Sequence, residues 1–420
     1  MNDPEQFLAE HLKLTRRFFL GIGATCMAVG GDRSFARSTE LSAPELVNAL
    51  DKLGPYFTPQ ADFQDVSRGK PLPHALPEHK MREVGLTRDT WKLEVLSDPD
   101  QPATLGKQFT KAEGTALDFK GLLELADKHA VRFPKVMTCL NIGCPLGTGI
   151  WEGIPLREVI WLTRPRENLR RVYYYGYHND DPKQMFRSSL AIDRVLEDPH
   201  DLPPVILCYK LNGQWLNSRR GGPVRMVVPE GYGFKSVKWL THVVLTNLYH
   251  ANDTYAQGNN DIDSALKTFA ATLSVPGEVK RGESIPIAGY AQVGVSGLAK
   301  VQIWIHPSRE AWPADDPYFA KAAWMDAHIL PPPRQWGGDL PEGKIPERTS
   351  GFDTAKGRPM TWPLRLCKVH WAVLLPGLSA GEYTLRCRTI DQKGHPQPLP
   401  RPFRKSGHCA IEAVTISVRT

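Results

Sequence analysis

The stretch RGGPVRMVVPEGYGFKSVKWL, residues 220–240, holds the clearest fold signal in this chain. Its apolar run lies between turn residues at 221–223 and 231–233, which predicts a short buried strand. A second strand is expected through 239–246. The basic residues fall in turns or at strand ends, where backbone N–H groups and arginine forks suit a phosphate. An ordinary surface charge exposed to solvent is an equally good interpretation of each of these basic residues.

Residues 37–219 alternate between helix and strand patterns. Helices are expected within 37–60 and at 119–130, 156–162 and 193–197, and strands at 91–95, 135–140, 172–177 and 205–209. The proline-punctuated basic loop at 66–77 cannot be a central strand. The pattern predicts a mixed α+β domain over residues 37–262.

Beyond a polar stretch at 251–264 the helical patterns stop. Strands are expected at 270–275, 285–291, 300–305, 371–375, 383–389 and 410–418. Strands between Gly/Pro turns without a strong helix are typical of a β-sandwich. We therefore predict a second domain over 263–420, interrupted at 310–363 by an insertion rich in Trp and Pro, and such an insertion is usually functional or interfacial.

The N-terminal residues 1–36 have the order of an export signal. Arg16-Arg17 precede an apolar run at 21–31, and Ser34-Phe35-Ala36 supply small residues for cleavage. The paired arginines resemble the twin-arginine signal of proteins exported already folded, often around a cofactor. The run of about eleven residues is shorter than the about 20 that span a bilayer. The expectation is a periplasmic protein without stable membrane insertion; the alternative is a surface helix.

Net charge and cysteines restrict the partners. Lys and Arg exceed Asp and Glu by 7, without a run of five basic residues, which indicates an anionic substrate or cofactor and not a nucleic acid. No Cys-x-x-Cys-His motif is present, so covalent c-type haem is excluded. Disulfides among Cys144, Cys208, Cys367, Cys387 and Cys409 stay undecided.

Cys139 ends a predicted strand and leads into the glycine-rich segment 141–149. Glycines there would let the backbone approach a ligand closely. A cysteine in such a position is more often a buried core residue than a ligand. A nucleophile would need a histidine to activate it, and no nearby histidine is positioned to do so by sequence.

Three segments, 205–213, 220–229 and 232–240, closely resemble the molybdopterin-binding domain of the sulfite oxidase family in order, spacing and residue type. Similarity at 91–95 and 136–156 extends the match. The strand-rich remainder resembles that family's C-terminal dimerisation domain. The resemblance implies a mixed α/β molybdopterin-binding domain followed by an immunoglobulin-like β-sandwich, and a homodimer.

The resemblance also assigns site residues. It makes Cys139 the thiolate ligand of molybdenum, beside the dithiolene sulfurs of the pterin. Arg68 would steady an anionic substrate, and Tyr255 would donate a hydrogen bond at the metal. The cofactor would be held by Val66, Ser67, Arg68, Gly69, Lys70, Asn179, Arg220, Arg225, Ser236, Val237 and Lys238.

This chain departs from the family at the substrate end. The family loop Arg-Asn-His is here Arg68-Gly69-Lys70, and Arg220 and Asn179 stand where the family has His and Asp. Where sulfite oxidases have Ala-Gly-Asn-Arg-Arg after the ligand cysteine, this chain has 140–144, Leu-Asn-Ile-Gly-Cys. Two lost arginines leave less positive charge for a dianion such as sulfite. We expect an intact metal site and an altered substrate pocket.

The implied function is a molybdenum–molybdopterin oxidoreductase without haem. It would oxidise a small anionic or sulfur-containing substrate by oxygen-atom transfer and pass electrons to an external protein such as cytochrome c. One alternative is a molybdenum-dependent sulfoxide (methionine sulfoxide) reductase. Another is an exported β-sandwich binding module without activity.

Overall fold

The computed structural model describes residues 44–51, 53–142 and 145–420, and Pro44–Thr420 form one compact unit. The predicted export signal and Cys144 lie outside the described residues. Within those residues, no helix has the length and apolar character needed to cross a membrane.

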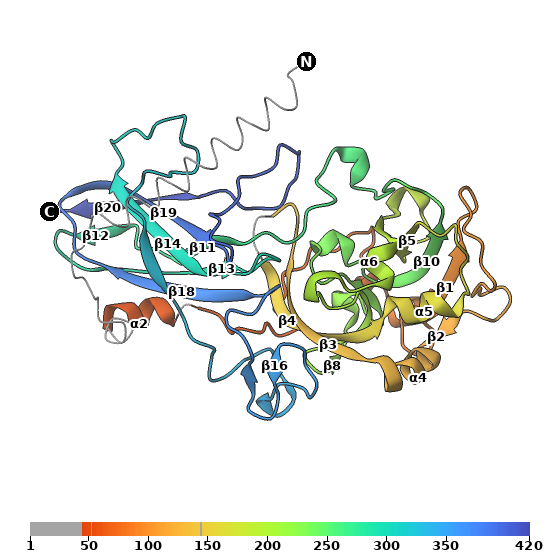
Figure 1. The fold of residues 1–420 in the computed structure, drawn as a ribbon. Coiled ribbons are helices and arrows are strands. Elements are labelled where there is room, and N and C mark those ends of the chain that lie inside the picture. The colour runs from red at the N-terminus through yellow and green to blue at the C-terminus, as the bar shows by residue number, and fades with distance from the viewer. Residues whose placement is uncertain (1–43, 52, 143–144) are drawn as a thin grey trace, which may run out of the picture. The chain divides into compact units, whose positions relative to one another are not determined.

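The first sheet has five strands in the order β2-β1-β10-β5-β6 (Figure 1). They are β1 (Lys92–Ser97), β2 (Leu117–Asp118), β5 (Arg171–Gly176), β6 (Arg187–Ala191) and β10 (Leu240–Thr246). Only the β1–β10 pair is parallel. Leu93 and Val95 are fully buried while Lys92 is exposed, as the alternation at 91–95 predicts. The Trp91 indole N–H donates to the Leu240 carbonyl at 2.7 Å and ties the two strands together.

The second sheet follows the order β3-β4-β7-β8, with β9 paired to β7. Its strands are β3 (Val131–Thr138), β4 (Pro145–Pro155), β7 (Ile206–Leu211), β8 (Gln214–Trp215) and β9 (Arg225–Val227). The glycine-rich segment was expected to approach a ligand, but most of it lies in β4. A Cβ on Gly149 would lie 2.5 Å from Leu211 Cδ1, and one on Gly153 would lie 2.3 Å from the Leu207 carbonyl oxygen. These glycines therefore allow β4 to pack closely on β7.

The third sheet has eight strands in the order β11-β13-β18-β15-β14-β19-β20-β12. They are β11 (Phe269–Ser274), β12 (Glu278–Lys280), β13 (Ile285–Gln292), β14 (Lys300–Pro307), β15 (Met325–Ile329), β18 (Lys368–Leu375), β19 (Gly381–Ile390) and β20 (Ala413–Arg419). Its core joins Ile287 and Trp371 from one half to Ile303 and Leu385 from the other. β15 comes from the predicted insertion and connects β18 to β14, so this part of the insertion is regular. The hairpin β16 (Phe352–Asp353) and β17 (Arg358–Pro359) lies there too.

The described helices are few and short. They are α2 (Pro44–Leu50), α3 (Glu78–Glu83), α4 (Phe119–His129), α5 (Leu156–Leu162) and α6 (Ile192–Leu196), with 3₁₀ turns η2 (Pro73–Ala75), η3 (Pro182–Gln184), η4 (Pro199–Asp201), η5 (Ser218–Arg220), η6 (Gly233–Lys235), η7 (Ala256–Gly258) and η8 (Pro341–Gly343). The Asp118 side chain caps α4 by accepting from the Gly121 N–H at 2.8 Å. The Thr138 hydroxyl donates to Gln292 Oε1 at 2.5 Å, a buried link from the end of β3 to β13.

Candidate functional site

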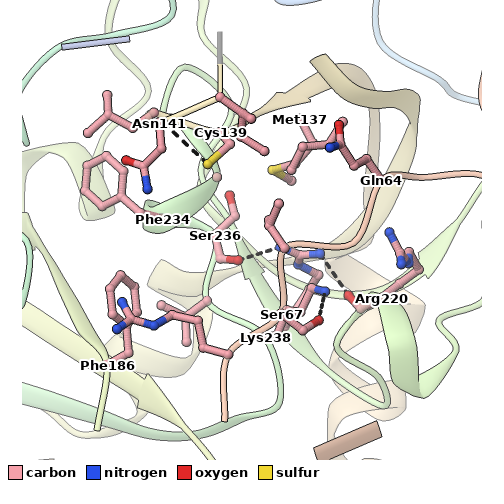
Figure 2. Close-up of a pocket in the computed structure, with 18 of the residues that line it drawn as sticks. Gln64, Ser67, Met137, Cys139, Asn141, Phe186, Arg220, Phe234, Ser236 and Lys238 are labelled. Carbon is pink, nitrogen blue, oxygen red and sulfur yellow. Dashed lines mark hydrogen bonds between the residues drawn. The ribbon is translucent and has the colours of Figure 1, made fainter. Parts of the chain in front are cut away.

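A cavity of about 490 Å³ gathers most of the predicted site residues (Figure 2). Those that line it are Val66, Ser67, Arg68, Cys139, Arg220, Arg225, Ser236, Val237, Lys238 and Tyr255. They come from the loop after α2, the end of β3, the β8–β10 region and the loop after β10. Segments that are far apart in the chain therefore meet at one site.

Gly69, Lys70 and Asn179 do not line the cavity, although cofactor contacts were expected of them. The Lys70 N–H donates to Gln184 Oε1 at 2.8 Å, and Asn179 Nδ2 donates to the Pro71 carbonyl at 2.8 Å. Gly69 has φ +121°, a conformation that favours glycine. In this structure the three residues hold the shape of the loop instead of facing the cavity.

Cys139 directly follows β3 and is half-buried, with its sulfur toward the cavity (Figure 2). The Asn141 N–H donates to Cys139 Sγ at 3.5 Å. The other described cysteines are buried and also free of disulfides. Burial raises the pKa of the Cys208 and Cys367 thiols to about 12, which keeps them protonated. Among the described cysteines, Cys139 alone offers a sulfur to this cavity.

The cavity has a cationic end, where two buried arginines have some N–H groups without an acceptor among the described residues. Arg225 donates to the Arg220 carbonyl at 2.8 Å and to the Ser236 carbonyl at 2.5 Å. Its Nε, together with Nε and Nη2 of Arg220, is buried without a hydrogen-bond partner among the described residues. Burial lowers the pKa of Arg225 to about 10. Because unpaired buried donors are costly, these atoms fit an anionic acceptor such as a phosphate.

Lys238 completes this end through Asp65, a residue that our sequence interpretation did not include. Lys238 Nζ lies 3.1 Å from Asp65 Oδ1 and donates to Ser67 Oγ at 2.6 Å. Burial, followed by the charge of Arg225, lowers the pKa of Lys238 to about 7. Burial alone would raise the pKa of Asp65, but the hydrogen bond from Ser67 and the charge of Lys238 lower it overall. The Asp65 carboxylate therefore orients the loop and the lysine together.

Tyr255 is placed by a buried ion pair. Lys235 Nζ lies 2.6 Å from Asp253 Oδ1, and the Ser189 hydroxyl donates to Asp253 Oδ2 at 2.6 Å. Lys235 is one of the basic residues within 220–240 whose position suits a phosphate, but in the structure its charge is paired with Asp253. Asn141 Nδ2 donates to the Tyr255 hydroxyl at 3.3 Å, which connects the tyrosine to the segment after Cys139.

Several lining residues were missed by sequence reasoning. Phe63 and Gln64 directly precede the predicted loop and could have been found by extending it. Lys405 comes from the connection between β19 and β20, and no local signal marks it. The other lining residues missed are Met137, Leu140, Asn141, Ile142, Leu146, Tyr177, His178, Phe186, Gly233, Phe234 and Trp239.

Comparisons with known proteins bear directly on this site. Residues 82–253 match the family model of the oxidoreductase molybdopterin binding domain. A nitrate reductase [NADH] of Volvox carteri is 30% identical over 134 residues, which cover 29% of this chain and 15% of that protein. A nitrate reductase [NADH] of Ulva prolifera is 26% identical over 242 residues, covering 44% and 28% respectively. The chain thus spans less than a third of the length of these relatives.

A solved structure resembles nearly the whole chain. The sulfane dehydrogenase SoxCD from Paracoccus pantotrophus superposes with a TM-score of 0.52 over 88% of this chain and 87% of that one, at 15% identity. This similarity shows a shared fold. The mixed sheets with few helices expected from the sequence are therefore confirmed.

Residues 82–253 thus match the oxidoreductase molybdopterin binding domain, and this match supports an oxidoreductase activity. The resemblance to the sulfite oxidase family expected from the sequence is confirmed. Such a domain implies the molybdenum–molybdopterin cofactor, and the unpaired donors of Arg220 and Arg225 fit its phosphate. The described residues contain no group of three or more His, Cys, Asp or Glu that could hold a metal by themselves. Cys139 fits a metal held mainly by the cofactor's own sulfurs.

Proposed function

We propose that this chain is a periplasmic molybdenum-dependent oxidoreductase that transfers an oxygen atom between a small substrate and water. In the oxidising direction the substrate gains the oxygen atom of water, and two protons and two electrons are released. The observation that carries the proposal is one cavity with the Cys139 sulfur in it and unpaired arginine donors at one end. The bound cofactor would supply the two-electron chemistry and pass on electrons.

The chain's own residues would bind and orient. Cys139 would be the thiolate ligand of the metal, and Arg220, Arg225 and Lys238 would hold the cofactor's phosphate. Ser236 and Val237, with Val66 and Ser67 on the opposite loop, would enclose the pterin. Tyr255 would donate a hydrogen bond at the reacting centre, and Arg68 would supply a positive charge there.

The wider setting of the enzyme is part of the proposal. The twin-arginine pattern within residues 1–36 supports export to the periplasm, and a separate protein such as a c-type cytochrome would accept the electrons. Residues 37–262 would form the cofactor domain, and 263–420 an immunoglobulin-like sandwich that serves dimerisation. The shared core of the two halves of the eight-stranded sheet supports the sandwich.

The proposal is tested by the metal content of the exported protein. The wild-type chain should contain stoichiometric molybdenum, and Cys139→Ser should abolish turnover while near-ultraviolet circular dichroism stays unchanged. Cys387→Ala, at a buried cysteine away from the cavity, should keep both the metal and the activity. A correctly folded wild-type chain that never contains molybdenum would overturn the proposal.

The direction of the reaction needs a separate screen. Candidate substrates are offered with cytochrome c or a dye as acceptor, and candidate sulfoxides with reduced viologen as donor. Turnover in the first arm supports a dehydrogenase, and turnover only in the second arm supports a sulfoxide reductase. Rapid reduction of the metal by sulfite at low concentration would contradict the expectation that the loss of two arginines has altered the substrate pocket.

A further inference from the structure

Three aromatic rings form the wall of the cavity away from its cationic end. Phe186 and Tyr255 meet edge to face, with centroids 5.0 Å apart at 84°, and Phe234 lies 5.3 Å from Tyr255 at 34°. Both phenylalanines are buried, and Tyr255 is half-buried. All three line the cavity. In Figure 2, Phe186 and Phe234 lie on one side of the view, and Arg220 lies on the other.

Two cations rest on this aromatic wall. The Arg68 guanidinium carbon lies 4.8 Å from the Phe186 centroid, and Lys405 Nζ lies 5.3 Å from the Tyr255 centroid. Neither charged group has a hydrogen-bond or ion-pair partner within the part of the chain that the structure describes. This contrasts with Lys238, whose charge is paired with a carboxylate. A stacked arginine keeps its N–H edge free for an anion.

Lys405 reaches the cavity from the C-terminal part of the chain, and its backbone is held there. The Asp261 N–H donates to the Lys405 carbonyl at 2.8 Å. Arg401, on the same segment, lies 2.8 Å from Asp261 Oδ1. The two contacts fix the connection between β19 and β20 beside the loop that carries Tyr255.

The aromatic wall lies next to Cys139. Asn141 donates through its backbone to Cys139 Sγ at 3.5 Å and through its side chain to the Tyr255 hydroxyl at 3.3 Å. The apolar side chains of Leu140 and Ile142 line the same cavity. A molecule held against the rings would therefore lie beside the thiolate.

We propose that this wall is the substrate subsite and that the substrate is an organic anion. Its apolar or aromatic body would contact Phe186, Phe234 and Tyr255, and its negative group would pair with Arg68 and Lys405. A small hydrated dianion would gain little from three ring faces and would lose water on contacting them. The inference rests on the proposed function, since it assigns the substrate class of the same site.

The test is calorimetric binding of unreactive probes to the molybdenum-loaded enzyme. Benzenesulfonate should bind at least about tenfold more tightly than sulfate or methanesulfonate, because only it offers a ring to the wall. Lys405→Met should weaken benzenesulfonate about tenfold and leave neutral methyl phenyl sulfone unchanged. Phe186→Leu should weaken both aromatic probes and leave methanesulfonate unchanged. Lys393→Met, at an exposed lysine outside the cavity, is the matched control and should change none of them.

Two results would overturn the inference: sulfate binding as tightly as benzenesulfonate, or unchanged benzenesulfonate affinity in Lys405→Met. Because every sample is assayed for molybdenum first, the two proposals fail separately. A chain that never contains the metal contradicts the proposed function. A loaded chain that prefers sulfate contradicts only the organic anion.

Discussion

Lys235 and Asp253 form a buried ion pair, with the ammonium nitrogen 2.6 Å from the carboxylate oxygen. The pair joins the turn η6, which carries Phe234, to the loop that carries Tyr255. It lies beneath the aromatic wall and does not line the cavity. Its role in this structure is therefore to hold two rings of that wall together.

Asp253→Ala should destabilise the fold by about 3–5 kcal/mol, because it leaves the Lys235 charge buried and unpaired. The measurement is the free energy of unfolding in urea. Glu342→Ala removes the partner of Lys344 at an exposed pair and should leave the free energy of unfolding almost unchanged, because solvent screens such a pair. Equal losses of unfolding free energy in the two variants would show that the buried pair stabilises the fold no more than the exposed pair does.

The affinity of the cationic end for anions should depend on pH, because Lys238 changes its charge there. Its pKa is lowered to about 7, so the ammonium is charged below that pH and neutral above it. Sulfate affinity of the cofactor-free chain should therefore fall as the pH rises through about 7, and sulfate itself keeps its charge in this range. The Lys238→Met variant should bind sulfate weakly, and its sulfate affinity should not change with pH over this range. A wild-type profile as flat as that of the variant would contradict the prediction.

Arg225→Lys should weaken retention of the cofactor. The lysine keeps the charge but loses the planar fork that reaches the Arg220 and Ser236 carbonyls and still has a free Nε. Charge-assisted hydrogen bonds contribute about 1.5–3 kcal/mol, so affinity should fall about 10–100-fold. The measurement is molybdenum per chain after dialysis. Arg219→Lys, at an exposed arginine outside the cavity, should retain the metal, and equal loss from both would refute the assignment.

Gly153→Ala should destabilise the second sheet by about 1–3 kcal/mol through overpacking. The new Cβ would lie 2.3 Å from the Leu207 carbonyl oxygen, and two paired strands cannot separate cheaply there. Gly277→Ala is the matched control, since nothing lies within 4 Å of its Cβ position. Thermal unfolding of both variants decides the matter: a Gly153→Ala protein as stable as the control would refute the close-packing role of this glycine.

Local patterns were enough for most elements. The alternation at 91–95, the helical pattern at 119–130 and the apolar run within 220–240 correspond to β1, α4 and β9. β4 was not anticipated, because glycines weaken a strand signal and their purpose here is contact with β7. The structure gathers most of the expected site residues in one cavity. Their roles at the metal stay predictions.

The sequence by itself indicated the cofactor class, because the segments that resemble the molybdopterin-binding domain are short and continuous, as in residues 220–240. Only the tertiary structure decided which basic residues are free to bind. Lys235 is taken by Asp253, Lys238 is shared with Asp65, and Lys405 arrives beside Tyr255 from a distant connection. The physical reason is that charge pairing depends on distances in space, and chain topology sets those distances between residues that no local pattern links.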